Sequence, residues 1–575
     1  MSTWKTAYES LEELSEYDDN ALGLFALGLK FGLDDLVSIG AEAVTDGSDD
    51  KKLDIVFINP EEEYAVVCQC YFTSKDKQNA PSNKASDLNT GLAWLLQRNI
   101  DDVPERIKSA AINLRESIKN GEVKNIHIWY VHNLPESHHV ETELVTVQHT
   151  AVNILEQEFP ESKVEVVHKE VGNNTIQEWY EDCRTPILIN ESITLSTIGG
   201  YEISGAGWSS YSTAIQARDL ARLYKKHRTK IFSANIRDYL GSRKSDSNIN
   251  NGIKRTVENN AGDFWAFNNG LTILTHSYTV DGDSIEAQGL SIVNGAQTTG
   301  AIGSLKKLPA PEAMVQARFI AVDSSSENLV ESIIRFNNSQ NKVEAADFRS
   351  TDKIQKRLKE EFKLIPNAEY EGGRRGSYSD IIRRRPNLLG SYTVGQALAA
   401  FHGEPITAYN KKAGIWINNK SYDKLFNDNT KAAHIVCTYS LVRAIESKKK
   451  QLQVKSSLTR DEEKTLKFLR QRGAIFLTTH AIAYCLESIL DRSVPNLFRI
   501  SFGVKCSPKQ ATDNWDSVID VLLPFVEHLN SAIINGLKNT SEIEQAVATF
   551  NSLVKSTRQF NAPVFDEFKR KVEAP

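Results

Sequence analysis

Several features that would narrow the function of this chain are missing from its 575 residues. Cysteine is scarce, and the six residues at positions 68, 70, 183, 437, 485 and 506 are too scattered for a disulfide-stapled secreted domain. No apolar run approaches the roughly 18 residues of a membrane span. The acidic N-terminal segment lacks the apolar core of a signal peptide. These absences predict a cytoplasmic protein that does not enter a membrane.

Two further absences limit the classes of activity. The chain contains no GxxxxGK(S/T) segment, which argues against a Walker-type ATPase. Its formal net charge of −6 gives no overall attraction to nucleic acid, so any such surface must be a local patch. A hydrophobic content of 40% and a charged content of 25% are ordinary for a globular protein, and the length predicts roughly two to four domains.

The first region has the pattern of an α/β domain. A helix is expected over residues 21–31, and a β-hairpin with strands at 53–58 and 64–72. Helices over 85–99 and 103–118 and a strand over 125–131 follow. Cys68 and Cys70 are separated by one residue on an expected strand, which suits neither a redox pair nor a zinc site, so we interpret them as packing residues.

The hairpin carries the first candidate for chemistry. Asp54 lies on its first strand and Gln69 on its second. A carboxylate and a second oxygen ligand that converge are what a Mg²⁺-dependent nuclease needs to hold its metal. A structural interpretation, in which Asp54 is an ordinary strand residue and Gln69 a satisfied core amide, remains open beside it.

A second candidate lies at two Asn-Gly turns. Asn268-Asn269-Gly270 ends one apolar run, and Asn294-Gly295 separates another from a helix that begins near residue 296. The free N–H groups of such a helix suit an anion, and Gln297 and Thr298 fall in its first turn. Asn337 and Gln340 belong to a further amide-rich stretch, 337–341. These amides form either a polar pocket for a nucleotide or nucleic acid, or a structural network that fixes loops.

The rest of the chain adds one basic segment and many expected helices. The segment 372–386 interleaves arginines with Tyr378, a composition that suits phosphate contact and base stacking, although the arginines could instead pair with acidic residues elsewhere. From about residue 422 onward the pattern is helical, with 448–460 expected as an exposed connection. The arginines of the basic segment are Arg374, Arg375, Arg383, Arg384 and Arg385.

An ordered series of motifs carries a family resemblance. FWAFNNGLTIL followed by SIVNGAQTTGAI resembles the core signature of the AIPR family, the abortive-infection phage-resistance proteins. FSANIRDYLG (232–241) and RFNNSQNKVEAADFRSTD (335–352) resemble its flanking segments, and YEGGRRGSY (370–378) and QALAAFHGEPITAY (396–409) resemble later blocks more loosely. The resemblance covers about residues 186–420 and implies a role in bacterial defence against phage, without implying a reaction.

The N-terminal region resembles a second fold family. Its helix, hairpin, helix and strand order is similar to PD-(D/E)XK restriction endonucleases of the D…QxK variant, which AIPR proteins often carry. That resemblance implies Asp54 and Gln69 as Mg²⁺ ligands. Tyr71 stands where the motif has lysine, and it cannot supply a cation. Lys75 is the nearest replacement, with Lys84 as an alternative.

A weaker resemblance concerns the second Asn-Gly turn. The strand, NGxQT and helix pattern is similar to a turn in ParB-type nucleotide-binding domains, with Asn294 in place of their aspartate and Thr298 or Thr299 in place of their arginine. It implies that a nucleotide is bound, while the two replacements argue against hydrolysis of a triphosphate.

The predicted protein is therefore a multi-domain α/β chain. It has a restriction-endonuclease-like α/β domain over 1–185, a mixed α/β AIPR core over 186–420 and an all-α region over 421–575. The hypothesis is a phage-defence nuclease that acts on nucleic acid, DNA more than RNA, with Asp54, Gln69 and Lys75 at its catalytic site. The alternative is a catalytically inactive sensor or scaffold of a defence complex. Defence-system partner proteins and a homodimer are compatible with either.

Overall fold

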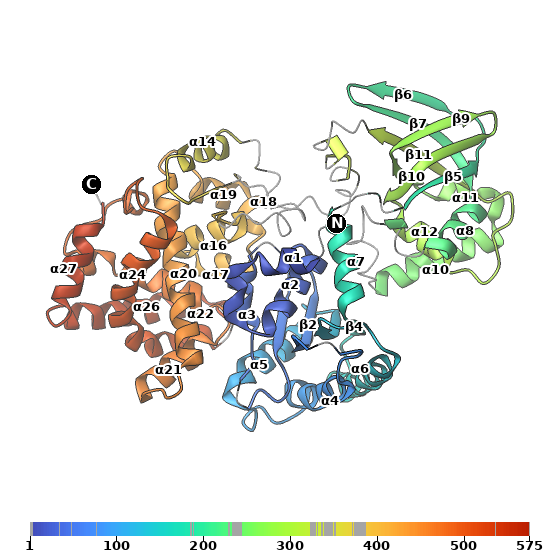
Figure 1. The fold of residues 1–575 in the computed structure, drawn as a ribbon. Coiled ribbons are helices and arrows are strands. Elements are labelled where there is room, and N and C mark those ends of the chain that lie inside the picture. The colour runs from blue at the N-terminus through green and yellow to red at the C-terminus, as the bar shows by residue number, and fades with distance from the viewer. Residues whose placement is uncertain are drawn as a thin grey trace. The chain divides into compact units, whose positions relative to one another are not determined.

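The computed structural model describes residues 4–33, 35–47, 49–75, 77–184, 187, 189–227, 231–232, 244–322, 329–330, 332–334, 337, 349, 352–370, 372, 387–534 and 536–573. The chain divides into two compact units (Figure 1). The first unit comprises Met1–Gly28, Gly32–Asn174 and Glu344–Pro575, and the second Leu29–Phe31 and Thr175–Val343. The first unit therefore joins the two ends of the sequence.

The N-terminal half of the first unit is built on a four-stranded sheet. Its strands follow chain order, β1 (Ile55–Asn59), β2 (Tyr64–Tyr71), β3 (Asn125–His132) and β4 (Glu165–Val171). β1 and β2 form the predicted antiparallel hairpin, and β2, β3 and β4 run parallel. Every residue of β2 except its last is buried, so this strand is a continuous apolar run rather than an alternating one. Cys68 and Cys70 are buried in it, as predicted.

Helices cover this sheet at the positions that the sequence indicated. α4 and α6 pack side by side, and α2 ends at Gly32, whose φ of 59° is the left-handed cap that glycine favours. The helices of this part are α1 (Trp4–Glu9), α2 (Asn20–Phe31), α3 (Leu36–Ala43), α4 (Ser82–Leu96), α5 (Glu105–Lys119) and α6 (His138–Glu158), and α7 (Asn173–Arg184) leads out of it.

The C-terminal half of the first unit is mainly helical, as predicted. Capping boxes begin two of its helices, Thr459 with Glu462 before α21 and Ser507 with Gln510 before α24. Its helices are α14 (Lys353–Phe362), α16 (Ser391–Phe401), α17 (Pro405–Asn410), α18 (Gly414–Ile417), α19 (Asn419–Leu425), α20 (Ala432–Val454), α21 (Arg460–Leu469), α22 (Ala474–Tyr484), α23 (Leu486–Leu490), α24 (Pro508–Leu522), α25 (Asn530–Ile533), α26 (Thr540–Thr557) and α27 (Ala562–Lys571).

The prediction of an exposed connection over 448–460 is wrong for its first part, because α20 continues to Val454. Lys448 lies 2.6 Å from the Asp520 carboxylate, and Lys450 lies 2.5 Å from that of Glu16. The intervening Lys449 is only 4% exposed. These lysines lie in a packed, charge-paired region, since their long side chains reach carboxylates on neighbouring elements.

The second unit is a seven-stranded, mostly antiparallel sheet with helices packed against it. The strand order is β5 (Ile189–Ser196), β10 (Ser284–Asn294), β8 (Leu271–Thr275), β11 (Met314–Val322), β7 (Trp208–Gln216) and β6 (Tyr201–Gly205), and β9 (Ser277–Asp281) pairs with β10. Only the β8–β11 pair is parallel among the named strands. Its helices are α8 (Ala217–His227), α10 (Lys244–Asn259), α11 (Phe264–Phe267) and α12 (Ala296–Gly303).

One helix boundary in this unit differs from the prediction. The sequence pattern of residues 213–226 predicts an amphipathic helix, but the helix begins at Ala217, because residues 213–216 complete β7 and pair with β11. Tertiary pairing here overrides a local helical pattern. Within the described ranges, no helix combines the length and apolar character needed to cross a membrane.

Candidate metal site on the N-terminal hairpin

Asp54 and Gln69 lie at the same end of the β1–β2 hairpin. Ile55, the first residue of β1, pairs with Cys68, so Asp54 comes directly before this pair and Gln69 directly after it along the chain. The backbone of Asp54 donates to the Cys68 carbonyl at 3.0 Å. Its Oδ2 accepts a 2.6 Å hydrogen bond from the Cys70 amide. Both the backbone and the side chain of Asp54 are therefore fixed by β2.

Two further aspartates converge on Asp54. Carboxylate oxygens of Asp46, Asp50 and Asp54 all lie within 4.8 Å of one another. Asp46 reaches this position because Val44, just after α3, forms an antiparallel bridge with Ile55 and folds the following loop back beside β1. The sequence analysis missed Asp46 and Asp50, although the recurrence of aspartate at every fourth residue was an available signal.

Short hydrogen bonds hold the loop that carries these two carboxylates. The Asn20 amide donates to Oδ2 of Asp46 at 2.7 Å. Asp50 accepts from the backbone N–H groups of Gly47 at 3.1 Å and Lys52 at 2.8 Å. The loop therefore keeps two negative groups near a third, an arrangement that costs electrostatic free energy unless a cation or a proton is present.

Burial raises the pKa of Asp54 from an ordinary 3.8 to about 7. The hydrogen bond from the Cys70 amide opposes this shift, the neighbouring charges of Asp46 and Asp50 add to it, and the cation of Lys84 opposes it. A carboxyl group whose pKa lies near 7 is typical of functional sites. A bound cation would favour the charged form of this group.

The side-chain oxygen of Gln69 is buried without a hydrogen-bond donor among the described residues. The side chain as a whole is only 3% exposed. A buried acceptor without a partner costs about 1–3 kcal/mol. The three converging carboxylates offer oxygen ligands, the kind that hard divalent cations such as Mg²⁺, Mn²⁺ or Ca²⁺ prefer.

Tyr71 and the lysines after it complete this region. Tyr71 follows Gln69 by two residues on β2, and so shares its face. Lys77 donates to the Tyr71 hydroxyl at 2.8 Å, and Lys84 lies 5.3 Å from the centre of its ring. The backbone of Lys75 donates to the Thr73 hydroxyl at 3.1 Å. The cation that acts on Asp54 is thus Lys84, while the predicted role of Lys75 stays a prediction.

In the second unit, one hydrogen bond ties together the two predicted Asn-Gly turns. Asn268 accepts from the Gly270 amide at 2.9 Å and donates to the Thr298 hydroxyl at 3.0 Å. Gly295 has a φ of 97°, and it starts α12 directly beside Leu271, the first residue of β8. The side chain of Asn268 is therefore already engaged, whereas Asn269 is exposed.

A separate polar row crosses the same sheet. Thr272 pairs in register with Asn294 on β10 and with Arg318 on β11. Asn337 accepts from the Thr272 hydroxyl at 3.2 Å and from the Arg318 guanidinium. Asn294 and Gln297 are half-buried beside this row. Of the predicted amides, Asn268 and Asn337 thus belong to two separate hydrogen-bonded groups, while Asn269 is exposed and Asn294 and Gln297 are half-buried.

Some predicted site residues lie outside the described residues. Gln340 is one of them. The basic segment is another, with Arg374, Arg375, Arg383, Arg384 and Arg385.

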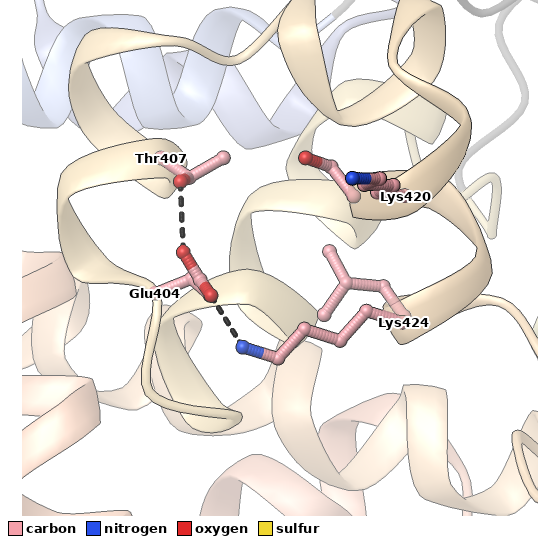
Figure 2. A pocket seen from close by; sticks show the side chains of 6 residues that line it. Glu404, Thr407, Lys420 and Lys424 are labelled. Carbon is pink, nitrogen blue, oxygen red and sulfur yellow. Dashed lines mark hydrogen bonds and ion pairs between the residues drawn. The ribbon is translucent and has the colours of Figure 1, made fainter.

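A small cavity of about 160 Å³ lies elsewhere in the first unit, between α17 and α19. Figure 2 shows the Glu404 side chain between Thr407 and Lys424. Thr407 donates to Glu404 at 3.1 Å, and Lys424 forms an ion pair with it. Its acidic side chain, Glu404, is already paired with Lys424, so this cavity is a weaker candidate than the hairpin site.

Comparison with known proteins adds one finding. A family model described as AIPR protein matches residues 232–555, more than half of the chain. No curated protein and no solved structure matches the chain.

Proposed function

The chain belongs to the AIPR family, and from this premise we propose that it acts in abortive-infection defence against phage as a divalent-metal-dependent nuclease. The observation that carries the proposal is the convergence of Asp46, Asp50 and Asp54 on the hairpin whose second strand holds the unpartnered oxygen of Gln69. Nucleic acid, DNA before RNA, is the proposed substrate.

The topology around the site supports a restriction-endonuclease-like fold. The Val44–Ile55 bridge adds a short antiparallel segment before β1, so a three-stranded meander precedes α4. After α4 and α5 the chain returns in β3, parallel to β2. Asp54 comes directly before β1 and Gln69 lies in β2, the two strands of the hairpin on which the D…QxK resemblance rests.

In this proposal Asp54, with Asp46 and Asp50, and Gln69 Oε1 hold the cation. A bound divalent cation would supply Lewis acidity toward a phosphodiester and lower the pKa of a water ligand. The chain's own contribution is to gather three carboxylates and to hold Asp54 through the Cys70 amide. Lys84 supplies a positive charge that lowers the pKa of Asp54 in this cluster.

The test is cleavage by the purified full-length protein. Plasmid DNA, single-stranded DNA and RNA are incubated with Mg²⁺ or Mn²⁺, using wild type, Asp54→Asn, Gln69→Leu and the control Asp87→Asn. Asp87 is an acidic residue on α4 whose nearest cation, Lys52, lies at 3.8 Å. We expect metal-dependent cutting in wild type and control, and its loss in the two site variants. Equal cutting by Asp54→Asn would contradict the proposal.

The neutral residue at position 71 favours one alternative function. If the cation site does not support hydrolysis, the chain would act as a sensor that binds nucleic acid or a nucleotide. In that case the groups around Asn268 and Asn337 would provide the ligand contacts, together with the predicted arginines 374–385. Oligonucleotide binding without cutting, under any of the metal conditions above, would favour this alternative.

A further inference from the structure

Two lysines are gathered around one aromatic ring next to the hairpin site. Their Nζ atoms lie 5.4 Å (Lys77) and 5.3 Å (Lys84) from the centre of the Tyr71 ring, within cation–π range. Lys77 also donates to the Tyr71 hydroxyl, and this hydrogen bond is the main reason why the Tyr71 pKa is lowered. Tyr71 therefore holds two ammonium groups at the exposed end of β2.

The two ammonium groups differ from several other lysines of this unit in their lack of a carboxylate partner among the described residues. Lys84 also lies in the first turn of α4, where the helix dipole disfavours a cation. That turn contains no acidic residue, and Pro81 before it gives no side-chain cap. The dipole of α4 therefore disfavours the positive charge of Lys84 at this position.

The position of this group relates it to the carboxylates. Tyr71 lies two residues after Gln69 on β2 and so shares its face, and the amide of Cys70 between them donates to the Asp54 carboxylate. Lys84 lowers the pKa of Asp54, so its charge is felt at that carboxyl group. Cationic and anionic groups therefore stand side by side, as a metal ion and a phosphodiester bound together would require.

We propose that Lys77 and Lys84, held against Tyr71, form a binding site for a backbone phosphate of nucleic acid, in place of the lysine missing at position 71. Lysine ammonium groups bind phosphate oxygens as point charges and need no fixed fork geometry. The placement of this phosphate next to the scissile bond rests on the proposed nuclease function. The binding itself does not, since it requires no metal.

The test is binding of a labelled 20-nucleotide single strand to the full-length protein in EDTA, measured by fluorescence anisotropy at several salt concentrations. The variant is Lys77→Met with Lys84→Met. The control is Lys163→Met with Lys169→Met, which removes the same charge from exposed positions near β4. We expect the first pair to weaken binding about tenfold and to reduce the salt slope by roughly one to two. The control should stay within about twofold.

Two results would overturn the inference. One is a double variant that binds the strand with wild-type affinity and salt slope. The other concerns inorganic phosphate. If the double variant loses phosphate binding but binds the strand as the wild type does, the ligand of this site is free phosphate and not nucleic acid. Failure of the nuclease proposal would look different. If the wild type cuts nothing, but the strand binds to the wild type and not to the double lysine variant, the phosphate site stands and only the proposed catalysis is contradicted.

Discussion

At the scale of single residues, the hairpin site combines groups that are unfavourable alone. Asp54 is largely buried and near two other carboxylates, and Gln69 carries a buried acceptor without a donor. Each costs stability in the metal-free protein, and each would gain a partner from the same cation. Binding of the cation proposed above would relieve these costs.

Asp54→Asn is expected to stabilise the metal-free protein at pH 8. The folded-state pKa of Asp54, about 7, lies above the ordinary 3.8, so ionisation costs folding free energy as pH rises from about 4 to 7. The variant removes that cost, on the order of 2–4 kcal/mol above pH 7 and close to zero below pH 4. Urea unfolding in EDTA at pH 4, 6 and 8 measures it. A difference that is the same at all three values would contradict the assigned cause.

Gln69→Leu is expected to separate stability from metal binding. Leucine removes the unpartnered Oε1, so the free energy of unfolding in EDTA should stay within about 1 kcal/mol of wild type or rise. Calorimetric titration with Mn²⁺ should show affinity reduced at least tenfold, because one ligand oxygen is gone. Unchanged Mn²⁺ affinity would remove Gln69 from the site.

At the scale of elements, the turn between β10 and α12 depends on Gly295. A Cβ at this position would lie 2.3 Å from a Leu271 methyl carbon and 2.9 Å from the Gly270 carbonyl oxygen, and the φ of 97° disfavours other residues. The strand, turn and helix were readable from the sequence because Asn-Gly is a local signal. The contact with β8 was not, since it joins two segments of the chain.

Gly295→Ala is expected to destabilise the second unit by about 2–4 kcal/mol, through combined backbone strain and overpacking. Gly282→Ala is the matched control, because Gly282 also has a positive φ, 55°, but a Cβ there meets no atom within 4 Å. It should cost about 1 kcal/mol. Thermal unfolding of both variants gives the comparison, and equal losses would mean that the crowding at Gly295 is relieved without cost.

In the candidate site, too, the residues placed by local sequence patterns could be predicted, whereas those placed by tertiary contacts could not. Apolar strands around turn residues placed Asp54 and Gln69 on one hairpin, and the structure confirms that hairpin. Asp46 and Asp50 could not be placed, because their approach depends on the bridge from Val44 to Ile55. The continuation of α20 through a lysine run was also hidden, since its carboxylate partners come from distant elements.

At the scale of the whole molecule, the first unit is closed by a buried charge network between α3 and α20. The Arg443 guanidinium binds both Asp35 oxygens at 2.7 Å and Glu446 at 2.8 Å. Ser38 donates to Glu446 at 2.6 Å, and Thr393 also donates to Asp35. The Arg443 cation keeps the Asp35 pKa below its usual value despite burial. The N-terminal sheet and the C-terminal helices are thus parts of one folded body.

Arg443→Met is expected to destabilise this unit by about 3–5 kcal/mol, because two carboxylates would remain buried without their cation. Lys467→Met is the control, since its ion pair with Glu105 also joins the two halves but is exposed, and should cost less than about 1 kcal/mol. Denaturant unfolding measures both. If the Arg443 variant unfolds like the control, the network does not join the halves energetically.

The Arg443–Asp35 contact has a consequence for folding during translation, because its partners are separated by 408 residues. At ordinary bacterial translation speeds, about 5–20 residues per second, α3 emerges from the ribosome about 20–80 s before Arg443 is made. During that interval the helix that leads into Asp46 lacks its anchor. The carboxylate cluster that follows α3 therefore lacks this anchor until about three quarters of the chain has been synthesised.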